Sequence, residues 1–208
     1  MKHVLAVLLL TALAPSAFAG AEDEVTYKTS VQDSMEACVS ACRGTELCTG
    51  VSFLQPDSRL PVGECKMTIT PPPKPEPWDL ATAESDLNAY RAQYGLRPVT
   101  LNPILTQASQ AHSDDMAEME NADHKGSDGF YHDTRIKGRG YNFSATAENV
   151  ASGQFSWEAV FKAWQDSPGH NKNLLAANMT EVGIALTYKP RTKYLTYWTM
   201  VLATPVGR

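Results

Sequence analysis

The sequence predicts an α+β protein made of a small part held by disulfides and a larger part packed in layers. Two observations separate the parts: all four cysteines lie between Cys38 and Cys65, and five of the 13 prolines lie at positions 71–77. A third observation indicates the fold class, because helical patterns in the larger part are followed by two β-rich segments. Helices followed by strands favour α+β packing in three layers.

Composition and charge exclude several classes of protein. The chain has 208 residues, of which 43% are hydrophobic and 20% are charged. These values exclude a wholly disordered chain, a coiled coil and a collagen-like repeat. The formal net charge is −5, and no run of basic residues occurs. We therefore expect neither a nucleic acid nor an anionic membrane surface as a partner.

Residues 1–19 have the pattern of a signal peptide. Lys2 and His3 precede the apolar stretch Val4–Ala14, and Ala17-Phe18-Ala19 has the small-x-small form of a cleavage site. The stretch is too short to span a bilayer, and no second apolar stretch of spanning length follows. We expect cleavage after Ala19 or Ala21 and a secreted protein, extracellular or periplasmic, with no transmembrane segment.

Clustered cysteines predict a small domain at residues 22–68. The four are Cys38, Cys42, Cys48 and Cys65. An even, clustered set in an exported chain indicates disulfides rather than a zinc site. Asp33-Ser34 predicts the cap of a short helix that ends near Gly44, and strands are expected at 49–54 and 64–69. Because Cys38 and Cys42 share one face of that helix, a bridge between them is implausible, and two of the three possible pairings remain open.

A proline-rich linker, residues 69–78, is expected to lead to a cysteine-free part at 79–208 that can bury its own core. Apolar spacing and capping residues predict four helices there, followed by a hairpin. The helices begin at residues 80, 103, 157 and 168, and the strands cover 181–188 and 194–203. Residues 122–154 are expected to form a long irregular loop. The predicted aromatic core consists of Trp157, Phe161, Trp164 and Trp198.

Histidines and a carboxylate gather in and around this central loop. The histidines are His112, His124, His132 and His170, and the carboxylate is Glu148. Imidazoles and a carboxylate on loops are typical of a metal site or an acid–base site. His112 lies on an apolar helix face and is expected to be a packed side chain, whereas His132 has no assigned role. The absence of cysteine from residues 79–208 excludes a thiol nucleophile in this part.

The small part resembles a PAN/Apple module. In such modules a helix carries two cysteines, a third lies nearby, and a late fourth is followed by a strand. The resemblance implies bridges Cys38–Cys65 and Cys42–Cys48, and it implies binding of a protein or a carbohydrate. A purely structural role of a small disulfide-held domain is the other interpretation.

Five motifs in the larger part resemble the CAP superfamily of cysteine-rich secretory, antigen 5 and pathogenesis-related (SCP-like) proteins. They are Leu87–Pro98, His124-x-x-Ser127-Asp128-Gly129, Ala147–Ala151, Trp164–Leu175 and Thr180–Ile184. The resemblance is to the shorter members of bacterial type. It implies that residues 79–208 form a three-layer α-β-α sandwich.

The same resemblance implies a cleft with two histidines and two acidic residues. By motif, the histidines are His124 and His170, and one acid is Glu148, which is also the candidate catalytic residue. The second acid normally follows the tryptophan of the third helix by three residues, where this chain has Ser167 beside Asp166. The tetrad is therefore altered. The implied cofactor is a divalent metal such as zinc, held by His124 and His170.

We therefore expect an exported CAP-domain protein that acts as a binding module rather than as an enzyme. Its partner would be an apolar small molecule such as a lipid, or an extracellular protein or carbohydrate, in a cleft lined by His124, Glu148 and His170. The alternative is a metal-assisted hydrolase, such as a protease, in which His124 and His170 hold the ion and Glu148 is the general base. A structural module of a wall or matrix is a third hypothesis.

Overall fold

The chain forms two compact units, of which the first ends at Pro73 and the second begins at Lys74. The computed structural model describes residues 26–44, 48–54, 62–69 and 72–207. The predicted signal peptide lies outside these described residues. Among the helices that the structure describes, none combines the length and the apolar character needed to cross a membrane.

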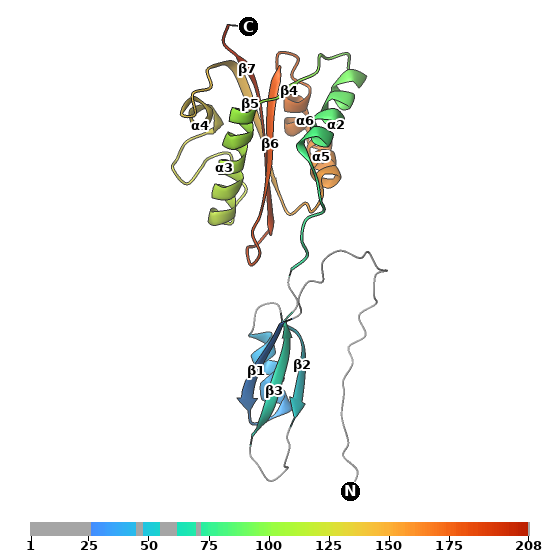
Figure 1. The fold of residues 1–208 in the computed structure, drawn as a ribbon, viewed down its shortest axis with the longest axis vertical. Coiled ribbons are helices and arrows are strands. Elements are labelled where there is room, and N and C mark those ends of the chain that lie inside the picture. The colour runs from blue at the N-terminus through green and yellow to red at the C-terminus, as the bar shows by residue number, and fades with distance from the viewer. Residues whose placement is uncertain (1–25, 45–47, 55–61, 70–71, 208) are drawn as a thin grey trace. The chain divides into compact units, whose positions relative to one another are not determined.

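The first unit is an antiparallel sheet with one helix. Its elements are β1 (Thr26–Gln32), α1 (Met35–Arg43), β2 (Cys48–Leu54) and β3 (Gly63–Ile69). β3 is the central strand and pairs with both β1 and β2 (Figure 1). α1 begins as predicted, because the Ser34 hydroxyl accepts a hydrogen bond from the amide of Ala37. The sequence does not predict β1, whose mixed polar residues become a strand by pairing with β3.

Two disulfides, Cys38–Cys65 and Cys42–Cys48, hold the first unit together. This is the pairing that the PAN/Apple resemblance implies, and it uses all four cysteines of the chain. Cys38 and Cys65 are fully buried and lie with Met67 in a small core between α1 and the sheet. A unit of this size buries little apolar surface, so the disulfide makes up part of the stabilisation that a larger core would supply.

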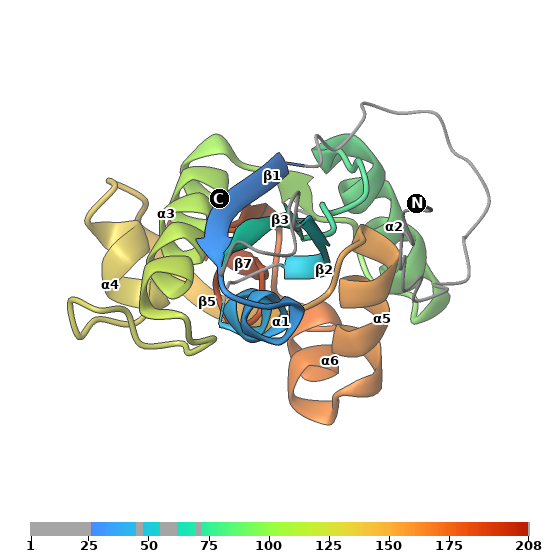
Figure 2. The ribbon, with the colours of Figure 1, turned by 90° about the horizontal axis from the view of Figure 1, so that it is seen from below.

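The second unit is a sheet with helices on both faces. The helices are α2 (Leu80–Gln93), α3 (Pro103–Met119), α4 (His132–Lys137), α5 (Trp157–Asp166) and α6 (Pro168–Leu174). The strands are β4 (Thr100–Leu101), β5 (Phe143–Ser152), β6 (Glu181–Tyr188) and β7 (Thr196–Pro205), in the order β4-β6-β7-β5. Figures 1 and 2 show α3 and α4 on one side of the sheet and α2, α5 and α6 on the other. The predicted α+β class is confirmed.

One sequence-based expectation for this unit is wrong, because residues 122–154 do not form a single irregular loop. They contain α4 and the edge strand β5. β5 is rich in Ala, Ser, Thr and Asn and therefore has a weak intrinsic strand pattern. It is held by antiparallel pairing with β7, from Phe143 opposite Pro205 to Ser152 opposite Tyr197. This pairing brings Glu148 to the edge of the sheet.

The central strand β7 sends alternate side chains into two cores. Trp198, Met200 and Leu202 face α2 and α5, and Val201 and Ala203 face α3 and α4. The predicted aromatic core is confirmed, since all four of its members are buried: Trp157, Phe161, Trp164 and Trp198. The two cores fix the helical layers on the sheet and so fix the site that lies at its edge.

α3 approaches β6 so closely that their backbones meet at Gly183. A Cβ atom added to Gly183 would lie 2.1 Å from the carbonyl carbon of Leu105 and 2.2 Å from the amide nitrogen of Thr106. The hydroxyl of Ser109 donates a hydrogen bond to the carbonyl of Gly183 at 3.0 Å. Only glycine fits at this contact.

We expect Gly183→Ala to destabilise the second unit by more than the ~1–3 kcal/mol typical of an overpacked core, because helix backbone cannot move aside as a side chain can. Urea unfolding measures the change. Gly169→Ala is the matched control, since a Cβ there meets no atom within 4 Å. Equal stability of the two variants would contradict this account of the contact.

We also expect reduction to unfold the first unit and to leave the second unit folded, because the cysteines all lie in the first. Loss of a native disulfide from a small domain costs about 2–5 kcal/mol. Calorimetry should show one thermal transition lost on addition of dithiothreitol and one kept. Unfolded, unreduced protein should have no free thiol; two or more reactive thiols would show that the bridges do not form.

Candidate functional site

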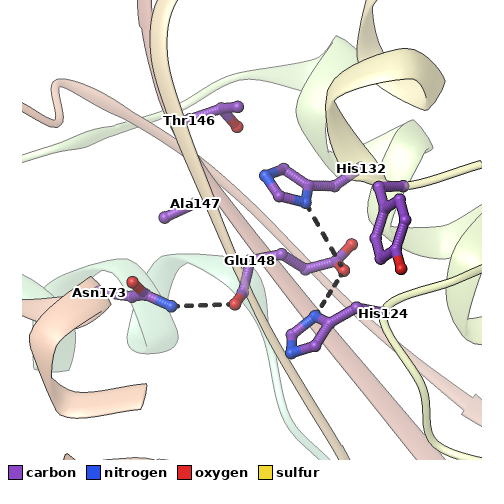
Figure 3. A pocket seen from close by; sticks show the side chains of 7 residues that line it. His124, His132, Thr146, Ala147, Glu148 and Asn173 are labelled. Carbon is purple, nitrogen blue, oxygen red and sulfur yellow. Dashed lines mark hydrogen bonds and ion pairs between the residues drawn. The ribbon is translucent and has the colours of Figure 1, made fainter. Parts of the chain in front are cut away.

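The carboxylate of Glu148 is the centre of the candidate site. Glu148 is 3% exposed and pairs in register with Val201, which faces α3 and α4. Because paired residues of neighbouring strands point to the same face, Glu148 points to that side as well. It lines a pocket of about 390 Å³ (Figure 3). The other residues that line this pocket are His124, Tyr131, His132, Thr146, Ala147 and Asn173.

Both carboxylate oxygens of Glu148 have close partners. Oε1 accepts a hydrogen bond from Nδ1 of His124 at 3.0 Å, and Oε2 accepts one from the guanidinium of Arg135 at 2.6 Å. The Arg135 side chain is 8% exposed, and it also donates to the backbone carbonyls of His124 and Phe130 at 3.1 and 2.8 Å. Arg135 therefore ties α4 to the strand and to the loop that carries His124.

Two further imidazoles lie beside the carboxylate. Nε2 of His112 and Nδ1 of His132 are 3.9 and 4.0 Å from Oε1 of Glu148. His112 is packed in α3, as predicted, and its Nε2 donates to the carbonyl of Asp123 at 2.8 Å. Nδ1 of His112 and Nδ1 of His132 are buried and have no hydrogen-bond partner in the described part of the chain. Three histidines therefore surround one buried carboxylate.

The surroundings shift the pKa values of this cluster in different directions. Burial, the largest single effect on Glu148, acts to raise its pKa, but the hydrogen bond from His124 and the charge of Arg135 outweigh it, so the pKa is lowered. The hydrogen bond to Glu148 raises the pKa of His124. Burial lowers the pKa values of His112 and His132. At neutral pH Glu148 is therefore ionised, and the two buried imidazoles are neutral.

The predicted ligand His170 is not among the residues that line the pocket. It lies on α6, which covers the face opposite α3, and its carbonyl accepts a hydrogen bond from the side-chain amide of Asn149 at 3.1 Å. Neighbouring strand residues point to opposite faces, so Asn149 points away from the side that Glu148 faces. The pKa of His170 is lowered, mainly because the side chain is partly buried and to a lesser extent by the charge of His124.

Asn173 joins α6 to the strand that carries Glu148. Its side-chain amide donates to the carbonyl of Glu148 at 3.0 Å, which Figure 3 shows, and to Oδ1 of Asn149 at 2.9 Å. These bonds hold the backbone carbonyl of Glu148 and the side chain of the next residue, Asn149. Asn173 and Asn149 are therefore positioning residues of the site.

No second carboxylate joins Glu148 among the residues that line the pocket. Asp166 forms an exposed ion pair with Lys162 one turn earlier on α5, and Ser167 connects α5 to α6. The altered tetrad inferred from the motifs thus corresponds to a pocket whose acid is Glu148 alone. Arg135 and His132, both from α4, lie beside it instead.

The residues at Glu148 do not fit a resident divalent ion. Within the described residues, no group of three or more His, Cys, Asp or Glu side chains is arranged to hold a metal. At Glu148 both oxygens are already bound, and one of the partners is the cation Arg135. A divalent cation would have to compete with that guanidinium for the same carboxylate.

Sequence reasoning placed His132 among the clustered histidines without a role, and it missed Arg135 and Tyr131 as parts of the site. All three lie in or beside α4, within the segment expected to be an irregular loop. Residues three apart on a helix share a face, and His132 and Arg135 have that spacing. The spacing of His132 and Arg135 therefore indicates that they share a face, but only if a helix is predicted at residues 132–137.

Comparison with known proteins gives the family. A sequence model of the cysteine-rich secretory protein family (CAP) matches residues 85–202. The uncharacterized protein YkwD of Bacillus subtilis strain 168 is 35% identical over 97 residues, which are 47% of this chain and 38% of that relative. The matched part is thus well under half of the length of YkwD.

Two solved structures share the fold. An outer surface protein from Borrelia burgdorferi has a TM-score of 0.53 and 18% identity, over 63% of this chain and 98% of that one. An extracellular protein containing a SCP domain from Bacillus anthracis strain Ames has a TM-score of 0.54 and 17% identity, over 68% of this chain and 52% of that one. The region matched by the family model contains the whole cluster around Glu148. The chain therefore belongs to the CAP, or cysteine-rich secretory protein, family.

Proposed function

We propose that this CAP protein is exported and that its second unit binds a polar ligand, a carbohydrate or a segment of an extracellular protein, without changing it chemically. The observation that carries the proposal is that Arg135 and His124 occupy both oxygens of Glu148. A carboxylate that is paired in this way, with a lowered pKa, is a poor general base at neutral pH. The pocket is therefore better suited to binding than to proton transfer by Glu148.

Two side chains of the pocket remain accessible to a ligand: the imidazole of His124 and the phenol ring of Tyr131. Because Glu148 holds Nδ1 of His124, the other ring nitrogen is left for a ligand, and the His124 side chain is 46% exposed. Tyr131 lines the same pocket and is 52% exposed. Polar groups placed beside ring faces suit a sugar, which has hydroxyls and an apolar face, or a peptide. This favours a carbohydrate or protein partner over an apolar small molecule.

Export is supported by three independent features. The N-terminal pattern is that of a signal peptide, and the two disulfides require an oxidising compartment to form and persist. The fold is shared with proteins described as an outer surface protein and as an extracellular protein. Secretion, to the cell exterior or the periplasm, is thus part of the proposal.

The first unit is proposed to be a PAN/Apple-like adhesion module. Its support is the spacing of the cysteines and the pairing Cys38–Cys65 and Cys42–Cys48, which the resemblance implies. Such a module would hold the protein near the partner that the second unit binds.

Binding should depend on Tyr131. In a screen of oligosaccharides, we expect Tyr131→Ala to weaken binding of any saccharide that binds the wild type by about tenfold or more, as for an exposed aromatic anchor. Tyr94→Ala is the matched control, because Tyr94 is equally exposed, at 56%, and does not line the pocket. Equal affinities of the two variants would place the saccharide elsewhere.

A metal-assisted hydrolase is the second candidate function. One observation favours it, the hydrogen bond from Nδ1 of His124 to Glu148, because metal-binding histidines are commonly oriented by such a carboxylate. In this hypothesis the ion is held by His124 and His170. Arg135 argues against it, since its charge lies at the carboxylate that would serve as the base.

We expect no hydrolysis of generic peptide and ester substrates above the blank, with or without added Zn²⁺. Chromogenic assays over hours at neutral pH measure this. Turnover that disappears in both His124→Ala and Glu148→Gln, but persists in Tyr94→Ala, would establish the hydrolase and reject the binding proposal.

A further inference from the structure

We propose that the pocket beside Glu148 takes an extended peptide segment of a partner protein, which pairs through its backbone with the outer edge of β5 as an added strand. The inference rests on the proposed function and narrows it, because it chooses a protein segment over a saccharide. The observation that carries it is the position of an unpaired strand edge in the wall of a pocket.

β5 is an edge strand of the sheet in the second unit. In the order β4-β6-β7-β5, β7 is the one strand that pairs with β5 among the described residues. The backbone groups of an antiparallel strand point alternately toward a neighbouring strand and away from it. Every second residue of β5 therefore turns its N–H and C=O groups outward, where another chain can pair with them.

Contacts with two helices show which residues of β5 turn outward. The carbonyl of Glu148 accepts a hydrogen bond from the side-chain amide of Asn173 on α6 at 3.0 Å. The carbonyl of Val150 accepts one from the indole N–H of Trp164 on α5 at 3.3 Å. Both donors lie outside the sheet, so these two carbonyls point away from β7. Because the alternation has a period of two residues, the amide and carbonyl of Thr146 point away from β7 as well.

Three of these outward groups have no hydrogen-bond partner in the part of the chain that the structure describes: the amide and carbonyl of Thr146 and the amide of Glu148. Thr146 and Ala147 are half-buried, and both line the pocket together with Glu148. Backbone polar groups require partners, which are water or a ligand at an open pocket. A peptide offers complementary C=O and N–H groups at the spacing of a strand, which a saccharide does not.

The walls of the pocket come from both helical layers. His124 and Tyr131 precede α4 and His132 begins it, on one face of the sheet, whereas Asn173 lies on α6 on the other face (Figure 3). A ligand that contacts both walls therefore lies beside β5 in the plane of the sheet, which is the position of a further strand. Alternate side chains of an added strand point to opposite faces, so they would meet the two walls in turn.

The part of the edge that is open to pairing has two ends. At one end Asn173 already occupies the carbonyl of Glu148, and at the other a β-bulge between Phe143 and Ala145 shifts the register. The half-exposed part of β5, residues 143–147, contains none of the charged residues or prolines that commonly protect an edge strand from pairing. The open edge is thus residues 145–148, and it fits a short peptide segment.

The test selects a peptide and then asks whether its backbone pairs with β5. The full chain is screened against an array of random-sequence hexapeptides, and the tightest binder is resynthesised with one N-methyl group at each amide in turn. N-methylation removes a hydrogen-bond donor and leaves the side chains unchanged. We expect methylation at alternate amides to weaken binding about tenfold or more, and methylation at the amides between them to have a much smaller effect.

The matching change in the protein is at Thr146. Thr146→Pro removes the outward amide proton, and Thr146→Ala, which loses the hydroxyl but keeps the amide, gives the reference affinity. The Pro variant should bind the selected peptide at least about tenfold more weakly than the Ala variant. If the Pro variant does not fold, hydrogen exchange of the wild type supplies the evidence. Bound peptide should protect the amides of Thr146 and Glu148, whereas the amide of Ala147, which points to β7, should change little.

The outcomes separate this inference from the proposed function. Peptide binding without alternation on methylation, or without protection of the two amides, would overturn the added strand and leave a binding pocket. A saccharide that binds through Tyr131, with no hexapeptide bound, would have the same meaning. Dimers of the wild type that Thr146→Pro dissociates would identify a second copy of β5 as the occupant and so reject a partner peptide. If neither a saccharide nor a peptide binds, both proposals fail.

Discussion

The ion pair between Arg135 and Glu148 is the interaction on which the site depends. A carboxylate that is 3% exposed cannot remain charged without a partner, and removing one member of such a buried pair costs about 3–5 kcal/mol. Arg135 supplies the partner and, through two backbone carbonyls, holds the loop that carries His124. One guanidinium thereby connects α4, this loop and β5. Residues of these three segments, together with Asn173 of α6, line the pocket.

The alternation of side chains along β5 divides the family's motif residues between two faces. Glu148 points toward α3 and α4, where it gathers the imidazoles of His112, His124 and His132. Asn149 points to the other face and holds α6 through the carbonyl of His170. The two neighbouring residues therefore have different roles. Glu148 lines the pocket, and Asn149 holds α6 against the sheet.

The two units are stabilised in different ways. The first has a small core in which the bridge Cys38–Cys65 occupies the centre. The second contains no cysteine and depends on apolar cores on both faces of its sheet and on the close approach of α3 to β6 at Gly183. The difference follows from size, because the fraction of surface that folding buries rises with chain length. The fold of the second unit therefore does not depend on a disulfide.

The sequence alone determined the elements whose signals are local. Ser34, Asn102 and Ser156 accept hydrogen bonds from the amides of the helices that they precede, and residues 181–188 form the strand predicted for them. The CAP motifs led to Glu148 and His124, because short motifs preserve residue types at a fixed spacing. Tertiary structure decided the rest. β5 has no strong pattern of its own and becomes a strand only through β7, while Arg135 meets Glu148 only because α4 packs beside that strand. These partners lie far apart along the chain, so their pairing depends on long-range packing that no local signal contains.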